Sequence, residues 1–311
     1  MTKPIVPLVI ISPVRDEEQF IRKTLDAMFA QSVQPQEWLF VDDGSTDGTR
    51  SIIEAYADKF PWIRVVSRKD RGFRQVGAGV IAAFNFGRER LRTKDYRFIA
   101  KLDGDVSFPP LYLEKMLNAL EGEPTLAAVS GKSFRVENGS LVEEFKIDEM
   151  VAGQFKLYKR NAFEDIGGFT ETILWDGIDI HRCRMKGYQT RSFDDPEARI
   201  IHHRLMGSSE SNVFKGRVRL GRGIWFMGYH PLYAIASGIF RTRERPFVIG
   251  GLIMIASYLY AALRREPQFP DRQFVQELRR WQLSRLRGIP MRLLGHNRKA
   301  IERRDSDGVI K

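Results

Sequence analysis

Short apolar runs and helical patterns alternate through the first hundred residues of the chain. Four runs of four or five residues are mostly β-branched or large and apolar, as expected of strands buried on both faces; they lie at 7–11, 38–41, 63–66 and Phe98–Leu102. Between them, the segments 17–31, 51–60 and 76–91 repeat apolar residues at helical spacing. This β-α-β order predicts an α/β fold with a Rossmann-like, mostly parallel sheet that has helices on both faces.

Polar clusters follow three of the four predicted strands. They lie at 13–18, at 42–47 and at Asp103-Gly104-Asp105. In parallel sheets, ligands bind beyond the carboxyl ends of the strands. We therefore expect three loops that are distant in sequence to share one crevice.

The Asp103-Gly104-Asp105 triplet has the composition of a metal-binding loop. Two carboxylates on either side of one glycine can both reach a single hard cation, and Mg²⁺ and Mn²⁺ prefer oxygen ligands. Asp and Gly are also ordinary turn residues, so the triplet alone does not decide between a metal site and a solvated turn. Its position at a strand end, with two other polar loops expected nearby, favours the metal site. The cluster at 42–47 by itself is equally typical of a turn with an N-cap at Ser45 or Asp47.

The net charge of the chain is +11, from 50 Lys and Arg against 39 Asp and Glu, and it is unevenly distributed. Residues 215–311 hold 20 basic and 7 acidic side chains, a net of +13, whereas residues 1–214 hold 30 and 32. Such asymmetry is typical of a globular body with a region that faces a membrane or a nucleic acid. We predict a globular α/β domain at 1–214 and a helical, basic region at 215–311.

The apolar segments of the basic region favour a membrane. Residues 247–263 are 17 uncharged residues with arginines on both sides, at the lower limit of a bilayer-spanning length. Further on, Phe274, Leu278 and Trp281 form one helical stripe among arginines, as in a helix that lies in a membrane interface. We predict monotopic or re-entrant attachment to an anionic membrane surface. A buried helical subdomain is the alternative, and a nucleic-acid-binding module is disfavoured because the region contains no nucleic-acid-binding motif.

The single cysteine and the N-terminal sequence argue against a disulfide-bonded protein, a cysteine-rich zinc protein and a secreted protein. Cys183 excludes an intramolecular disulfide and a cysteine-rich zinc site, and its place in a helical pattern at 178–186 predicts a core position. The apolar run at 5–11 is too short for a signal-peptide core. We therefore expect a protein at the cytoplasmic face of the membrane, not a secreted one.

Several motifs taken together resemble the nucleotide-sugar site of the inverting family 2 glycosyltransferases, which have the GT-A fold. The motifs are Pro13-Val-Arg-Asp-Glu-Glu, Val41-Asp-Asp-Gly-Ser-Thr-Asp-Gly-Thr, Leu102-Asp-Gly-Asp, Gly167-Gly-Phe and Trp175-Asp-Gly-Ile-Asp. The resemblance covers about residues 5–205 in the family's order. It implies transfer of a sugar from a nucleoside-diphosphate donor to a hydroxyl of a lipid-linked or polysaccharide acceptor, with Mg²⁺ or Mn²⁺ as cofactor. A nucleotidyltransferase on the same fold is disfavoured, because it would need a Gly- and Arg- or Lys-rich loop where 13–18 is acidic.

The resemblance also implies roles for individual residues. Pro13, Arg15, Glu17 and Asp43 would bind the nucleoside, and Asp105, assisted by Asp103, would hold the metal at the donor's diphosphate. Asp16 departs from the asparagine that is common at its position in the family.

The catalytic base is implied near Trp175-Asp176, where many family members have Glu-Asp. Asp176 aligns with that aspartate, and Asp179, one helical turn later, is the rival. Asp176 could also simply cap a helix at 178–186. His202 either completes the shell of the metal or is a strand-end histidine without a metal.

Overall fold

The computed structural model describes residues 3–302, except 71, 73–74, 76, 138, 145–147, 205–212 and 244–245; for 213 and 288–302 it describes the backbone alone. The chain forms two compact units, Met1–Ser209 and Glu210–Lys311.

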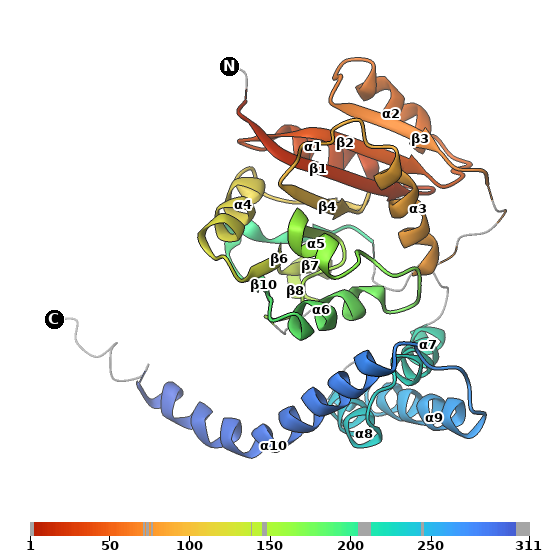
Figure 1. The fold of residues 1–311 in the computed structure, drawn as a ribbon, viewed down its shortest axis with the longest axis vertical. Helices are drawn as coiled ribbons and strands as arrows, with labels where there is room; N and C mark the ends of the chain where they lie inside the picture. The colour runs from red at the N-terminus through yellow and green to blue at the C-terminus, as the bar shows by residue number, and fades with distance from the viewer. Residues whose placement is uncertain are drawn as a thin grey trace. The chain divides into compact units, whose positions relative to one another are not determined.

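The first unit is built on a seven-stranded sheet (Figure 1). Its strands are β1 (Ile5–Val14), β2 (Gln34–Asp42), β3 (Ile63–Ser67), β4 (Phe98–Leu102), β6 (Leu126–Gly131), β9 (Phe155–Lys159) and β10 (Gln189–Phe193). They lie in the order β10-β6-β9-β4-β1-β2-β3. β9 runs antiparallel to β4 and β6, and the other neighbouring strands pair in parallel. The predicted mostly parallel sheet is confirmed.

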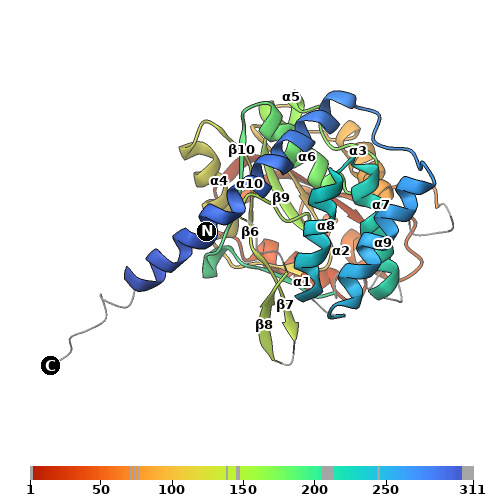
Figure 2. The same ribbon diagram turned by 90° about the horizontal axis from the view of Figure 1, so that it is seen from below.

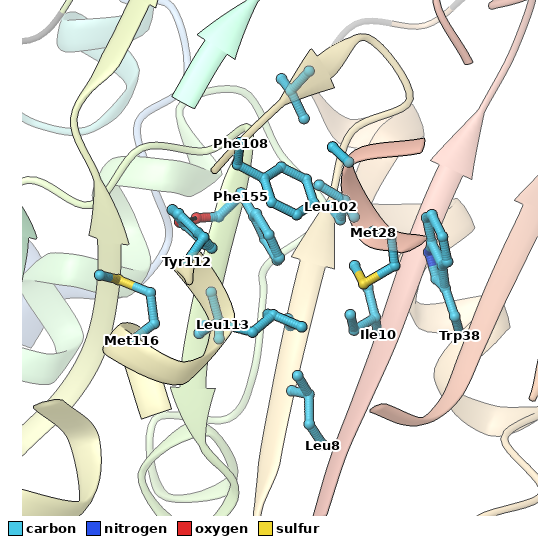
Figure 3. Close-up of a cluster of buried hydrophobic side chains, with 14 of the residues drawn as sticks. Leu8, Ile10, Met28, Trp38, Leu102, Phe108, Tyr112, Leu113, Met116 and Phe155 are labelled. Carbon is cyan, nitrogen blue, oxygen red and sulfur yellow. Dashed lines mark hydrogen bonds between the residues drawn. The ribbon is translucent and has the colours of Figure 1, made fainter. Parts of the chain in front are cut away.

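Helices cover both faces of this sheet, with one core on each side. α1 (Ile21–Phe29), α2 (Thr49–Ala57) and α4 (Tyr112–Gly122) pack on one face, and α3 (Ala78–Glu89), α5 (Arg160–Asp165) and α6 (Trp175–Met185) on the other. Alternate residues of β1 point to opposite cores: Leu8 and Ile10 to the first, Val9 and Ile11 to the second. Figure 3 shows part of the first core, with Ile10 between Leu8, Met28 and Trp38.

A second, four-stranded sheet was not predicted, and it positions part of the site. Its strands are β5 (Val106–Ser107), β11 (Ile200–His202), β7 (Ser133–Glu137) and β8 (Ser140–Glu143), in that order. β5 follows the Asp103–Asp105 loop directly and pairs antiparallel with β11, so that Val106 lies opposite His202. This pairing brings a histidine from 97 positions further along the chain next to the acidic loop.

The second unit is helical. It contains α7 (Val213–Phe226), α8 (Pro231–Phe240), a 3-10 turn η2 (Arg241–Arg243), α9 (Ile249–Leu263) and α10 (Arg272–Glu302). α10 carries the stripe that was predicted to face a membrane, but Phe274 and Leu278 are fully buried. Phe274 packs on Phe269, which is also buried, with ring centroids 5.1 Å apart. For this stripe the prediction was wrong and the buried-subdomain alternative is correct. Across the described residues, none of the helices has the length and apolar content needed to cross a bilayer.

Candidate active site

The three polar loops converge as the sequence predicts. β1 lies between β2 and β4 in the sheet, so the segments that follow these strands meet at one edge. The first two loops are interlocked by backbone N–H groups that donate to side-chain oxygens. Glu17 N–H donates to Thr49 Oγ1 at 2.7 Å, and Glu18 N–H donates to an Asp47 carboxylate oxygen at 3.1 Å. The two loops therefore form one rigid wall of the site.

The conformation and hydrogen bonds of Asp16 explain why an aspartate can stand where the family commonly has asparagine. Its φ is +53°, in the left-handed region that Asn and Asp adopt more readily than other residues with a side chain. Its Oδ1 accepts the N–H of Thr46 at 2.8 Å, and its own N–H donates to Ser45 Oγ at 3.1 Å. The conformation and these bonds are open to either residue type, so the substitution leaves the loop intact.

The four residues implied in nucleoside binding fall into two groups. Pro13 lies opposite Val41 in the β1–β2 register, and Arg15 donates to the Asp43 carbonyl oxygen at 2.8 Å and to Asp70 at 2.9 Å. The Asp43 carboxylate accepts a bond from the guanidinium of Arg68 at 3.0 Å. The buried carboxylate of Glu17 instead bonds to the guanidinium of Arg204.

Asp105 is held by two cationic side chains. Its Oδ2 lies 3.5 Å from His202 Nε2 and 3.3 Å from Arg204 Nε. The other ring nitrogen of His202 lies 3.2 Å from a carboxylate oxygen of Glu144. Burial alone would lower the pKa of His202, but bonding to the two carboxylates raises it to about 10. Burial acts to raise the pKa of Asp105, yet the bond from His202 and the nearby positive charges hold it below its ordinary value.

Asp103 points to a different partner. Its carboxylate accepts a bond from Lys101, whose side chain is 2% exposed, and Lys101 Nζ also donates to the Gly153 carbonyl oxygen at 2.8 Å. Burial, opposed by Lys101 and assisted by the negative charge of Asp105, raises the pKa of Asp103. The two carboxylates of the triplet are thus held by separate sets of cations.

These residues fit a divalent cation that is shared with a ligand, but not a cage built from protein alone. In the part of the chain that the structure describes, no three His, Cys, Asp or Glu side chains are grouped closely enough to hold a metal ion. Mg²⁺ in nucleotide sites usually takes only one or two carboxylates and completes its shell with phosphate oxygens and water. Asp105 and Asp103 offer that donor set. His202 would have to lose a proton to join it, because an imidazolium has no lone pair to donate.

Asp179 is part of a buried ion pair. Its carboxylate is 1% exposed and accepts bonds from Lys156 Nζ at 2.8 Å and from the Tyr158 hydroxyl at 2.7 Å. Lys156 is itself fully buried. Burial raises the pKa of Asp179, with Lys156 acting in the opposite direction. The pair connects β9 to α6 inside the protein.

Asp176 is half-buried and lies at the edge where the loops meet. α6 begins at Trp175, after Leu174 at a φ of +56°, so Asp176 is in the first turn of the helix. The alternative that Asp176 caps a helix beginning at 178 is therefore wrong. A methyl group built on Gly153 would lie 3.7 Å from Asp176 Oδ2, which places Asp176 beside the same glycine that Lys101 contacts.

Trp175 packs against two buried lysines. Lys101 on β4 and Lys156 on β9 are directly opposite each other in the antiparallel register. Their Nζ atoms lie 5.2 and 5.1 Å from the Trp175 ring centroid, within the range of cation–π attraction. Asp103 and Asp179 balance the two charges, and Lys156 Nζ also donates to the Asp176 carbonyl oxygen at 3.2 Å. This chain of contacts connects the acidic triplet with the first turn of α6.

A cleft of about 630 Å³ opens beside the interlocked loops. It is lined by Asp16, Glu18, Gln19, Phe20, Asp47, His203 and Arg204. The ring of His203 stacks on that of Phe20 with centroids 6.4 Å apart. The cleft shares Arg204 with the acidic site, and so offers space for a bound molecule next to it.

Four residues of the site were not singled out from the sequence. Lys101 stands as an isolated charge inside a predicted apolar strand, a signal that could have identified it, whereas Lys156 lies close to Lys159 in a strand that was not predicted. Arg204 is two residues after His202, but the sequence pattern assigns it no role in the site. Glu144 follows a short strand of the second sheet and belongs to no motif, so the sequence offers no signal for it.

Comparison with known proteins identifies the family of the chain. The family model described as "Glycosyl transferase family 2" matches residues 9–173. Among curated relatives, glycosyltransferase AglE of Haloferax volcanii is 25% identical over 294 residues, covering 86% of this chain and 88% of its own length. Poly-beta-1,6-N-acetyl-D-glucosamine synthase of Staphylococcus aureus is 23% identical, and the match covers 79% of this chain and 60% of the synthase.

Solved structures show the same fold. The mannosyltransferase PcManGT of Pyrobaculum calidifontis, in complex with GDP-Man and Mn²⁺, superimposes with a TM-score of 0.54 at 18% identity, covering 87% of this chain and 78% of its own. S. aureus TarS 1-349 in complex with UDP-GlcNAc gives 0.51 at 15%, covering 81% and 71%. The family model spans residues 9–173, more than half of the 311-residue chain, and the protein therefore belongs to glycosyl transferase family 2.

Proposed function

We propose that this glycosyltransferase moves a sugar from a nucleoside-diphosphate donor to a hydroxyl of a lipid-linked or polysaccharide acceptor, with inversion at the anomeric carbon. The observation that carries the proposal is the meeting of the donor loops, the Asp103–Asp105 triplet and Asp176 at one edge of the sheet. PcManGT and TarS bind GDP-Man and UDP-GlcNAc, which are donors of this class.

The donor would be held from two sides. Pro13, Arg15 and Asp43 form the wall at the ends of β1 and β2, where the nucleoside would bind. Glu17, fixed by Arg204, would complete this wall from the side of the acidic triplet.

Asp105 and Asp103 would hold Mg²⁺ or Mn²⁺ together with the phosphate oxygens of the donor, and His202 would join them only after losing its proton. When bound, such a cation neutralises the charge that builds on the diphosphate as it leaves the sugar. PcManGT carries Mn²⁺. In the present chain Arg204 and Lys101 keep the two carboxylates in place, and Glu144 orients the ring of His202.

Asp176 is the proposed base. An acceptor hydroxyl that attacks the anomeric carbon must lose its proton as the new bond forms, and a carboxylate near that oxygen takes it. Attack from the face opposite the diphosphate inverts the anomeric centre. Asp176 is half-buried and borders the site through Gly153, whereas the Asp179 carboxylate is engaged by Lys156 and Tyr158 in the interior. We therefore assign the base to Asp176 and a structural role to Asp179.

The test is a pair of matched variants. Asp176→Asn should lose at least a hundredfold in transfer rate while donor binding, measured by calorimetry, stays within about twofold of wild type. The control replaces the whole buried group, Lys156→Met with Tyr158→Phe and Asp179→Leu, and should keep transfer. If Asp176→Asn transfers sugar at the wild-type rate and the control is folded but inactive, the assignment is reversed.

We further propose that the reaction takes place at the cytoplasmic face of a membrane. The support is the net charge of +13 in residues 215–311 and the uncharged segment at 247–263, a composition that suits an anionic lipid surface.

A further inference from the structure

The second unit contains two helices that touch through glycine. α8 and α9 lie side by side (Figure 2) and cross where Gly238 meets Gly251. A methyl group built on Gly251 would lie 2.3 Å from the Gly238 carbonyl oxygen, and one on Gly238 would lie 2.3 Å from a side-chain carbon of Ile255. α7 approaches α9 in the same way, since a methyl on Gly221 would lie 2.4 Å from the Met254 carbonyl oxygen. The backbones of these helices are in direct contact.

The outer faces of α8 and α9 are large and apolar. On α8, Leu232 and Ile239 are each 60% exposed; on α9, Leu252 is 56% and Leu263 84% exposed. The remaining large exposed side chains of the two helices are Ile235, Phe240, Ile249, Leu259 and Tyr260. Neither helix contains a charged residue. The two outer stripes are therefore continuous apolar surfaces.

This arrangement is the reverse of a water-soluble helix pair. In water, large apolar side chains pack between helices, whereas in lipid, helices associate through small residues and direct large apolar side chains outward. The inner face of α9 belongs to an ordinary core, because Tyr258 of α9 packs on Trp225 of α7, and Phe274 of α10 is fully buried. The lipid-like arrangement is thus a local feature of the contact between α8 and α9 and of their outer faces.

The charges at the ends of the hairpin indicate which occupant covers it. Arg241 and Arg243 stand between the two helices in η2, and Arg264 and Arg265 follow α9 directly. Arginines that border an apolar surface suit the anionic headgroups that border the acyl chains of a bilayer. A protein partner would ordinarily find a hydrogen-bonding group every 100–200 Å² of interface, and the side chains of these stripes offer almost none.

The lengths of α8 and α9 limit how deeply the hairpin can enter a bilayer. α9 has 15 residues and α8 has 10, which correspond to about 22 and 15 Å, against a hydrocarbon core of about 30 Å. We propose that the α8–α9 hairpin (residues 231–263) inserts its outer apolar stripes into one leaflet of an anionic bilayer, with the arginines of η2 and of the end of α9 at the headgroups. This inference rests on the membrane location proposed above and names the element that provides it.

The test uses the full chain and vesicles of phosphatidylcholine with and without phosphatidylglycerol. Wild type should co-sediment with the anionic vesicles. Leu252→Glu and Ile239→Glu should each weaken binding roughly tenfold or more, because each replaces a lipid-facing apolar group by a charge. Val136→Glu, at a 59% exposed apolar position of the other unit, is the matched control and should bind as wild type does. Arg264→Gln with Arg265→Gln should lower affinity for the anionic vesicles selectively, by about fivefold for each arginine.

A second measurement reports insertion directly. Leu252→Trp should be quenched by lipids brominated on their acyl chains, and Val136→Trp should not. The proposal is overturned if wild type binds neither kind of vesicle, if Leu252→Glu binds like wild type, or if the wild type is a dimer in solution that Leu252→Glu converts to a monomer. The last result would assign the hairpin to a second copy of the chain. None of these readouts depends on sugar transfer, so failure here is distinguishable from failure of the proposed activity.

Discussion

Replacing Lys156 by methionine should strongly destabilise the first unit. The ammonium of Lys156 is the positive partner of Asp179, and both side chains are at most 1% exposed. Methionine has a similar length and fills the same space, so the substitution removes the charge without leaving a large cavity. It leaves the Asp179 carboxylate buried, with a hydrogen bond from the Tyr158 hydroxyl but no cation opposite it.

The size of the effect follows from protonation. A carboxylate that loses its ammonium in the interior takes up a proton, and holding that proton at pH 7 against an ordinary pKa of about 3.9 costs about 4 kcal/mol. This agrees with the 3–5 kcal/mol typical of breaking a buried ion pair. At 2–4 °C for each kcal/mol, the expected fall in Tm is roughly 6–20 °C. The penalty should shrink to about 1.5 kcal/mol at pH 5, because the cost of protonation falls with pH.

The assay is urea unfolding of wild type and Lys156→Met at pH 7 and pH 5, with a rescue series. Adding Asp179→Leu removes the second charge and should recover most of the loss, since apolar replacement of a buried pair is often neutral or stabilising. Tyr158→Phe should then recover the remainder by removing a buried hydroxyl that has lost its acceptor. A loss below about 1 kcal/mol for Lys156→Met, or a loss that is the same at both pH values, would refute the reasoning.

Three further predictions concern other positions. Burial lowers the pKa of His181 to about 3, so below pH 6.5 its imidazole takes up a proton in the unfolded state but not in the folded state. The free energy of unfolding should therefore fall by about 2 kcal/mol between pH 7 and pH 5. His181→Leu should remove this loss in calorimetric scans. Asp105→Asn should abolish the Mn²⁺-dependent part of the thermal shift given by a nucleoside diphosphate, and an unchanged shift would contradict the proposed metal site. Gly131→Ala should prevent folding or cost more than about 3 kcal/mol, because a methyl there would lie 1.4 Å from the Ala198 carbonyl oxygen. Gly122→Ala, at the end of α4, meets nothing within 4 Å and should not lower the stability measured by urea unfolding.

The fold of the first hundred residues was predictable because each buried strand there is a short apolar run. The predicted strand Phe98–Leu102 has the bounds of β4, and the strand at 63–66 differs from β3 by one residue. The second sheet and the antiparallel β9 were not predicted. β9 contains Lys156 and Lys159, and the lysines break its apolar pattern although the strand is almost wholly buried.

The meeting of the three loops was predictable from topology alone, but the partners of their carboxylates were not. Which cation reaches Asp103 or Asp105 depends on strands that are distant in sequence, such as the pairing of β5 with β11. The apolar stripe of α10 shows that a helical pattern likewise does not reveal what covers its apolar face. Periodicity identifies an apolar face, but Phe274 and Leu278 look the same in sequence whether that face meets lipid or a protein core.

The position of β9 determines how the first unit can assemble. β9 joins β4 to β6, so the half of the sheet that carries β1–β4 is connected through it to the half that carries β6 and β10. The donor loops are encoded in the first 105 residues, before β9 emerges during synthesis, whereas α6 with Asp176 follows it. Because contacts between sequence neighbours form faster than distant ones, we expect the donor half to fold first. The burial of Lys156 and Asp179 against each other would then be a late step, and its loss should appear mainly in the unfolding rate.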